Sequence, residues 1–193
     1  GDFCVAGLDV HSDRWLRFVS FGEAEPLADF QMMFLNAPGS CQPLDLVRIE
    51  IAQKISRGNH SEDFMIENSS WWKLGRMTIE DVIKIHPPEE YRNIFGNLGE
   101  YITENEMKKF RFRYSLIFIR VRELKIIFER NKNNELKGRA SFIYNGQQYS
   151  RIRVTDPEYS REIFLENAYL VMSMPVKDFH GRYYKLVAKI FPA

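Results

Sequence analysis

Hydrophobic and polar residues alternate with a period of two along several short segments of the chain. In 139–157, two runs rich in β-branched and aromatic residues flank Asn145-Gly146. A type I′ turn needs positive φ at both of its central residues, and Asn-Gly meets that need, so the pair predicts a two-residue β-hairpin. With that turn, Phe142 would face Tyr149 and Ala140 would face Arg151.

The two faces of this predicted hairpin differ in character, because side chains alternate along a strand. One face carries Phe142, Tyr144, Tyr149, Arg151 and Arg153, and the other carries Ser141, Ile143, Ser150, Ile152 and Val154. Two arginines in an apolar core would be costly to desolvate. We therefore expect the Ile/Val face to point inward and the aromatic and cationic face to point outward.

The same alternation predicts further strands at 3–8, 14–20, 44–51, 110–122, 124–130, 169–174 and 182–191. Helical patterns are short. Thr78 and Asp81 form a variant of the capping box for a helix at 78–85, and further helical turns are expected at 88–95, 103–107 and 158–167. The polar segment 58–68 is expected to be irregular. Many short strands separated by turn signals are typical of all-β barrels or sandwiches.

Charge is distributed unevenly along the chain. Residues 1–105 hold nine Lys/Arg and seventeen Asp/Glu, a net charge of −8, whereas residues 106–193 hold eighteen and nine, a net charge of +9. Such asymmetry indicates two domains, one of them facing a polyanion; attraction between the two halves is the alternative. We predict an all-β protein with minor helix, made of two small barrels at 1–103 and 104–193, with helical turns as the linker.

Cysteine content and hydropathy suggest the compartment. Cys4 and Cys41 belong to no C-x-x-C pair, which excludes a zinc ribbon, and no disulfide is expected. No apolar run approaches the roughly 18 residues of a membrane span. We therefore expect a protein of the reducing cytoplasm with no membrane contact. The chain starts at Gly1 rather than Met, which indicates a trimmed or partial sequence.

Several motifs follow one another in a characteristic order. They are Ala6-Gly7, Trp15 to Arg17 with Val19-Ser20, Leu44 to Val47, Glu67-Asn68 with Trp71 and Trp72, Tyr144 to Gly146 with Tyr149, Thr155 to Pro157, and Tyr184 to Ala188. In this order the chain resembles the dual OB-containing domain of bacterial and archaeal proteins. Two departures are a missing first-strand segment before Cys4 and Phe18 at a position where the family has proline.

The resemblance implies two OB-like β-barrels in tandem, joined by a short helical stretch, and nucleic-acid binding. It also implies an association with conflict or defence genes, and it implies no reaction. OB folds bind oligonucleotides on one sheet face, where aromatic rings stack bases and cations hold the backbone.

The candidate nucleic-acid-binding residues of the second half are cationic or aromatic and come from predicted strands. They are Arg111, Arg113, Arg139, Tyr149, Arg151, Arg153, Tyr183 and Lys185. The alternatives are a seam to the acidic half and an ordinary surface. In the first half, Trp15 and Arg17 share a strand face and could stack a base beside a phosphate. A half-buried tryptophan with a snorkelling arginine is the favoured interpretation there.

Polar clusters offer little chemistry. Metal binding could be suggested by His60, Glu62, Asp63, Glu67 and Asn68, but no two histidines stand at i, i+4, so a solvated loop is favoured. A nuclease core could be suggested by Asp45, Glu50 and Lys54, but Ala52 occupies the position where its lysine belongs. There is no G-x-S-x-G, H-E-x-x-H or P-loop motif.

We therefore predict a non-catalytic module without cofactor or metal, which binds DNA or RNA, as single strands or through the backbone. The main alternative is a protein-interaction module that recognises a protein partner in a prokaryotic defence or conflict system. A cryptic metal-dependent nuclease is the weaker alternative.

Overall fold

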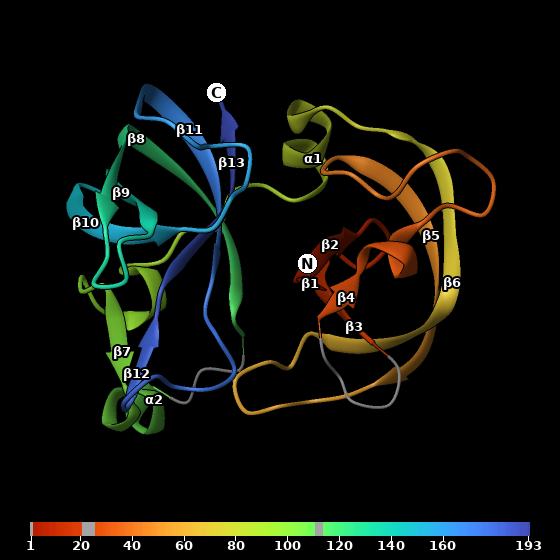
Figure 1. Cartoon of the computed structure of the whole chain (residues 1–193), viewed down its shortest axis with the longest axis horizontal. Coiled ribbons are helices and arrows are strands. Elements are labelled where there is room, and N and C mark those ends of the chain that lie inside the picture. The colour runs from red at the N-terminus through yellow and green to blue at the C-terminus, as the bar shows by residue number, and fades with distance from the viewer. Residues whose placement is uncertain (1, 21–25, 111–113) are drawn as a thin grey trace. The chain divides into compact units, whose positions relative to one another are not determined.

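The computed structural model describes residues 2–20, 26–110 and 114–193. The chain forms two compact units, the first ending at Pro87 and the second beginning at Pro88 (Figure 1). Both consist mainly of strands, which confirms the prediction of an all-β protein with minor helix. Within the described ranges, no helix is long and apolar enough to cross a membrane.

The first unit is built around a four-stranded sheet. Its elements are β1 (Asp2–Phe3), β2 (Val5–Asp9), β3 (Arg14–Val19), β4 (Leu27–Ala28), the 3-10 helix Asp29–Met32, β5 (Asp45–Lys54), β6 (Asp63–Arg76) and α1 (Ile79–Ile85). The sheet order is β2-β3-β6-β5, with β3 and β6 parallel and the other pairs antiparallel. Phe18, Ile66 and Trp71 pack with Leu27 in its core.

The predicted helix at 78–85 is confirmed as α1. The hydroxyl of Thr78 accepts a hydrogen bond from the backbone N–H of Asp81, and the Asp81 carboxylate accepts one from the backbone N–H of Thr78. This reciprocal cap satisfies donors that the first helical turn leaves unpaired. The capping pattern therefore placed the start of the helix correctly.

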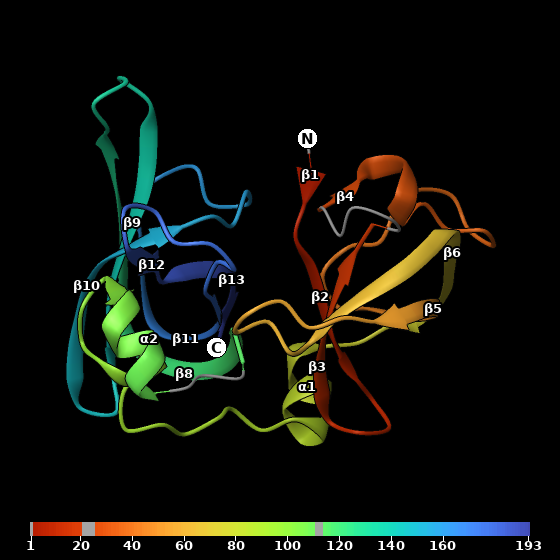
Figure 2. The same cartoon turned by 90° about the horizontal axis from the view of Figure 1, so that it is seen from below.

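The second unit is a closed five-stranded barrel. Its strands are β8 (Leu116–Arg130), β9 (Leu136–Tyr144), β10 (Gln147–Val154), β11 (Ile163–Ser173) and β13 (Leu186–Pro192), in the order β10-β13-β11-β8-β9. The pair β10 and β13 is parallel and the others are antiparallel. Four further elements of this unit are not barrel strands: the 3-10 helix Ile94–Gly96, β7 (Tyr101–Thr103), α2 (Glu104–Phe110) and β12 (Arg182–Tyr184). Figure 2 shows the β8–β9 hairpin extending beyond the barrel.

The sheet of the first unit repeats the strand order of the second, with one strand fewer. In the barrel, β8 pairs with β9, β9 with β10, β10 in parallel with β13, β13 with β11, and β11 with β8. The first unit has the same pairings among four strands, with β2, β3, β5 and β6 in the places of β9, β10, β11 and β13. The described residues of the first unit contain no counterpart of β8, so its sheet is an open version of the OB barrel.

The central hairpin forms with the predicted turn but with a different register beyond it. Asn145 and Gly146 have φ of 50° and 74°, and Phe142 pairs with Tyr149 as expected. Ala140, however, pairs with Ile152 and not with Arg151, because the register shifts between Tyr149 and Ile152. Arg151 has a φ of 61° at this β-bulge.

The bulge reverses the expected orientation of the hairpin. Phe142, Tyr144 and Tyr149 are buried in the barrel core, and Ile152 is buried beside them. The extra residue lets Arg151 and Arg153 stay exposed while the aromatic rings point inward. The prediction of an outward aromatic face is therefore wrong, because simple alternation cannot foresee a bulge.

Other differences follow from tertiary packing. Residues 88–103 belong to the second unit and not to the first, because Ile94, Phe95 and Ile102 are buried in the barrel's core cluster. The helices expected at 88–95 and 158–167 do not form: the first segment is irregular up to the 3-10 turn, and β11 begins at Ile163. Phe110 ends α2 and does not begin a strand.

Candidate nucleic-acid interface

Cations gather on the outward side of β8, β9 and β10. Register places Ile127 beside Arg139 and Arg139 beside Arg153, while Glu129 pairs with Lys137. The basic strand face is defined here as Lys125, Lys137, Arg139, Arg151 and Arg153, none of which is buried. β9 and β10 are the second and third barrel strands, and these strands carry the oligonucleotide surface in OB folds.

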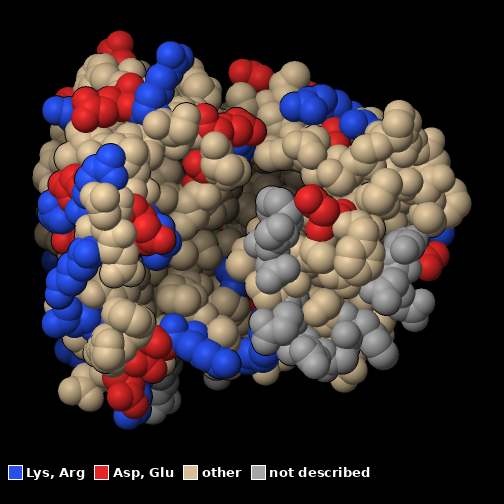
Figure 3. Space-filling view, viewed as in Figure 1, with Lys and Arg blue, Asp and Glu red and all other residues tan. Residues whose placement is uncertain are grey.

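Acidic side chains are interleaved with this basic strand face. On the second unit, at the left of Figure 3, Lys and Arg side chains stand among Asp and Glu side chains. Hydrogen bonds from Asn131 and Lys137 lower the pKa of Glu135, and Arg153 contributes in the same direction. The face is therefore cationic in sum but carries local counter-charges.

Arg151 is the most heavily engaged cation of the face. Its Nη1 and Nη2 each lie 2.9 Å from an oxygen of Glu129, and its Nε lies 3.6 Å from Oε1 of Glu100. The guanidinium group binds a carboxylate with the same two-pronged geometry that it uses for a phosphate. Its side chain is still 55% exposed, so a ligand can reach it.

A groove of about 540 Å³ lies next to Arg151, between β10 and the segment that precedes α2. Gln148 and Ser150 of β10 line one side. Glu100, Tyr101 and Thr103 line the other, together with Asn97. The lining is rich in amide, hydroxyl and carboxylate groups, which can make hydrogen bonds to a polar ligand.

Lys185 fixes the wall of this groove from inside the barrel. Its side chain is buried, and Nζ donates to the backbone oxygen of Asn97 at 2.6 Å and to Oδ1 of Asn97 at 2.8 Å. Nζ also lies 5.5 Å from the centre of the Tyr149 ring. Burial lowers the pKa of Lys185 to about 7, although the nearby Glu106 carboxylate acts in the opposite direction.

Glu106 continues the same network into α2. It accepts hydrogen bonds from Nδ2 of Asn97 at 2.9 Å and from the backbone N–H and hydroxyl of Thr103 at 2.8 and 2.7 Å. Thr103 and Glu106 thus cap α2 as Thr78 and Asp81 cap α1. These contacts hold the segment 97–106 in one arrangement.

An aromatic and cationic cluster stands on the two-stranded sheet of β7 and β12. The Arg182 guanidinium lies 4.6 Å from the centre of the Tyr101 ring, and the Tyr101 and Tyr184 rings are 5.4 Å apart. Tyr183 alternates to the other side and packs against the barrel core. The predicted site residues did not include Tyr101, Arg182 or Tyr184, although the alternation in 182–191 separates Tyr184 from Tyr183.

Comparison with known proteins agrees with this architecture. A sequence model of the dual OB-containing domain matches residues 1–190. The chain belongs to the dual OB-containing domain family. No curated protein and no solved structure gives a significant match. Family membership gives this dual OB-containing domain the character of an OB-fold binding module and accounts for its two related units.

The predicted site residues of this dual OB-containing domain are dispersed. Arg139, Arg151 and Arg153 lie together on the basic strand face. Tyr149 and Lys185 are buried inside the barrel, and Tyr183 is half-buried. Arg111 and Arg113 lie outside the described residues, and Trp15 and Arg17 belong to the first unit.

Arg17 belongs to a buried polar cluster of the first unit. It contacts the His60 ring and lies 3.9 Å from an oxygen of Asp63 and 4.0 Å from one of Glu62. Burial of Arg17 lowers its pKa, while Glu62 and Asp63 oppose that shift. Trp15 is half-buried, as the favoured interpretation expected, and meets His86 edge-on at 6.0 Å. Arg17 does not snorkel to the solvent as that interpretation expected, because its guanidinium group is buried.

The expected solvated loop around His60 is therefore wrong. His60, Glu62 and Asp63 are all buried. The positive charges of Arg17 and Arg57 offset the free-energy cost of desolvating the two carboxylates. The side chains of Glu67 and Asn68 lie outside those described. Across the described ranges, no group of His, Cys, Asp and Glu side chains is arranged to hold a metal ion.

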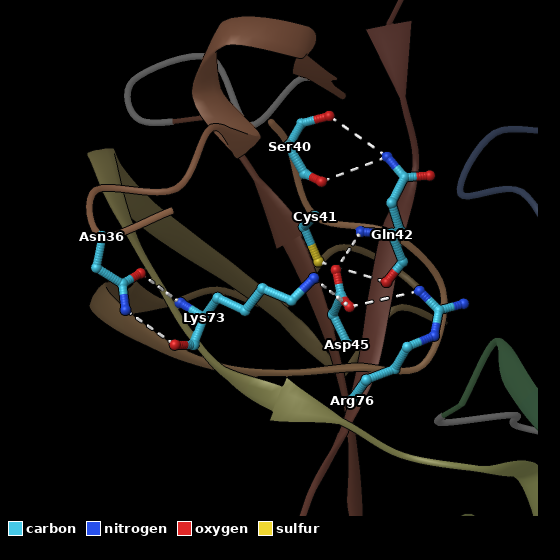
Figure 4. Close-up of polar contacts among 7 residues, drawn as sticks. All are labelled: Asn36, Ser40, Cys41, Gln42, Asp45, Lys73 and Arg76. Atoms are coloured by element: carbon cyan, nitrogen blue, oxygen red, sulfur yellow. Dashed lines mark hydrogen bonds and ion pairs between the residues drawn. The ribbon is translucent and has the colours of Figure 1, made fainter. Parts of the chain in front are cut away.

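Asp45, the suggested nuclease acid, has a structural role. Figure 4 shows its carboxylate between Lys73, at 2.9 Å, and Arg76, at 3.7 Å, with the backbone N–H of Gln42 donating to it at 3.0 Å. Burial raises the pKa of the neighbouring Cys41 thiol to about 11, and the Asp45 charge adds to this shift. Both cysteines are free thiols.

Proposed function

We propose that this dual OB-containing domain binds single-stranded DNA or RNA through the basic strand face of its second unit, without catalysis. The observation that carries the proposal is the register of β8, β9 and β10. It gathers four cations on β9 and β10, the strands with which OB folds contact oligonucleotides, and a fifth, Lys125, on the adjoining strand β8. The phosphates of a strand crossing this face would meet Arg139 and Arg153 in neighbouring positions.

Fluorescence polarisation with labelled DNA and RNA strands of about 12 nucleotides, in about 50 mM salt, tests the proposal. The double variant Arg139→Gln/Arg153→Gln should bind about tenfold more weakly than wild type, because two charge-assisted phosphate contacts are lost. The matched control is Lys84→Gln on α1 of the first unit, where an exposed lysine pairs with Asp81. Absence of binding by the wild type, or equal loss in the control, would refute the proposal.

A second candidate function rests on the first unit. Trp72 and Leu74 are exposed on one face of β6. Leu35 is also exposed, and its backbone N–H donates a hydrogen bond to the backbone oxygen of Trp71 on the same strand. Contiguous patches of exposed apolar side chains are typical of protein-interaction surfaces. A protein partner from a prokaryotic defence or conflict system is the corresponding hypothesis. Pull-down of products of neighbouring genes by wild type, and not by Trp72→Ser/Leu74→Ser, would support it.

Under either proposal the protein works in the cytoplasm. Nucleic acids and the products of defence genes are both present there. The two thiols, Cys4 and Cys41, would remain reduced in that compartment.

A further inference from the structure

The groove beside the basic strand face has the dimensions of a ligand site. Its volume of about 540 Å³ falls within the roughly 300–1,000 Å³ typical of small-molecule sites. Gln148 and Ser150 are exposed on β10, and both belong to the lining. Tyr101 and Thr103 of β7 face them across the groove. The groove thus offers the Gln148 amide, the Ser150 hydroxyl and the Tyr101 ring to one occupant.

The wall of the groove is held in place before any ligand arrives. Asn97 receives two hydrogen bonds from the buried Lys185 and donates to Glu106 and to the backbone oxygen of Tyr101. Burying a lysine side chain costs free energy, so a buried lysine indicates a defined structural role. Here the task is to anchor the segment that forms the wall, and such a preorganised site loses little entropy on binding.

The groove adjoins the basic strand face. Ser150 lines the groove and directly precedes Arg151, whose Nε lies 3.6 Å from Oε1 of Glu100 on the opposite wall. A phosphate held by Arg151 would therefore stand at the mouth of the groove. The nucleobase next to that phosphate is then the group that can enter the groove.

The geometry points to a base-binding site: the groove takes one unpaired nucleobase of a strand whose phosphates lie on the basic strand face. This inference rests on the function proposed above. The side chains of Gln148 and Ser150 supply hydrogen-bonding groups for the base edge, and Tyr101 supplies a ring. A base inside a duplex is stacked and paired, and must leave the helix before it can enter such a pocket. The site therefore selects single strands over duplexes.

The test fills the groove and leaves the cations intact. Ser150→Trp places an indole in the groove. Ser160→Trp is the matched control, because Ser160 is also exposed and lies in the connection from β10 to β11, outside the groove lining. Both variants are compared with wild type for binding to a labelled single strand and to the duplex of the same sequence. Gln148→Ala serves as a milder second variant.

We expect wild type to prefer the single strand at least about tenfold, since stacking one base contributes roughly a factor of ten. Ser150→Trp should lose that preference, binding the single strand about tenfold more weakly and the duplex unchanged, while Ser160→Trp keeps it. Gln148→Ala should lose part of it. Unchanged duplex binding by Ser150→Trp shows that the variant is folded.

Two other results separate this inference from the proposed function. If Ser150→Trp and Gln148→Ala both bind single strands as wild type does, while Arg139→Gln/Arg153→Gln binds poorly, the base site is overturned and the nucleic-acid function stands. If wild type binds neither single strand nor duplex, the base site and the proposed function are both overturned.

Discussion

Lys185 is a residue whose surroundings determine its chemistry. It lies between β12 and β13, and its side chain is buried. Its Nζ donates to Asn97, so it does not lie on an exposed strand face together with Tyr183. Lys185 was predicted as a site residue because of its charge, since alternation placed it on the same face as Tyr183. The corner that buries it arises because β12 pairs with β7 whereas β13 pairs with β11 in the barrel, and these pairings are not visible in a local pattern.

The lowered pKa of Lys185 makes stability depend on pH. In the folded state the amine loses its proton near pH 7, whereas in the unfolded state it keeps it to about pH 10.4, so the unfolded state binds more protons between these values. The free energy of unfolding should rise from pH 7 to 9 by about 1 kcal/mol per unit. Urea unfolding followed by circular dichroism measures the slope.

Lys185→Met should abolish this rise, because no proton is then exchanged at the site. Lys109→Met, at an exposed position on α2, should keep it. A slope that is equal in wild type and Lys185→Met would show that the buried amine does not titrate in this range.

Arg151 shows the opposite situation, a cation that is exposed but engaged. Glu129 binds it through both carboxylate oxygens, so a phosphate must displace Glu129 to use both prongs. Glu129→Gln should therefore tighten binding of a single strand about two- to fivefold, in proportion to the 0–1 kcal/mol that an exposed ion pair contributes. Fluorescence polarisation measures this gain.

Glu104→Gln, which removes the same charge from α2, is the control, because Glu104 pairs with Lys108 and not with the basic strand face. If both variants tighten binding equally, the gain comes from net charge alone and not from the release of Arg151.

At the scale of elements, the parallel pair β3 and β6 depends on a buried polar cluster. Arg17 of β3 and Asp63 of β6 are register partners, and Arg57 donates to Asp63 at 2.8 Å. Burial would raise the pKa of Asp63, but hydrogen bonds from His60 and Arg57 lower it overall. The carboxylate is therefore charged at neutral pH and joins the two strands to the loop that precedes β6.

Asp63→Ala should destabilise the first unit by about 3 kcal/mol, because it leaves the buried Arg17 with one partner fewer. Tryptophan fluorescence in urea isolates this unit, since Trp15, Trp71 and Trp72 all belong to it. Asp29→Ala, at an exposed position of the same unit, should change stability by less than about 0.5 kcal/mol. A similarly small loss in Asp63→Ala would contradict a structural role for the cluster.

Elements with strong local signals were predictable and those shaped by partners were not. The turn at Asn145-Gly146 and the cap at Thr78 depend on residues close in sequence, and both are confirmed. The start of β6 escaped prediction because it lies within the largely polar segment 58–68 and pairs in parallel with β3, far away in the chain. The bulge at Arg151 likewise depends on how β10 fits β9, and it reversed the inferred burial of three aromatic side chains.

At the scale of the whole molecule, the charge division at residue 105 differs from the boundary between the two compact units, which lies at Pro87. Assigned to the units of the structure, Lys/Arg and Asp/Glu number eight and thirteen in residues 1–87 and nineteen and thirteen in residues 88–193, so the net charges are −5 and +6. The asymmetry is smaller than a division at residue 105 indicates. It still places the excess of cations on the closed barrel, which bears the basic strand face.

The most direct test of the account is the salt dependence of single-strand binding by the full chain. The logarithm of the affinity falls with the logarithm of salt concentration with a slope of about −0.7 per neutralised phosphate. Arg139→Gln/Arg153→Gln should therefore flatten the slope by about 1.4 relative to wild type, since it removes two such contacts. A slope that is identical in the two proteins would show that nucleic acid does not lie on this face.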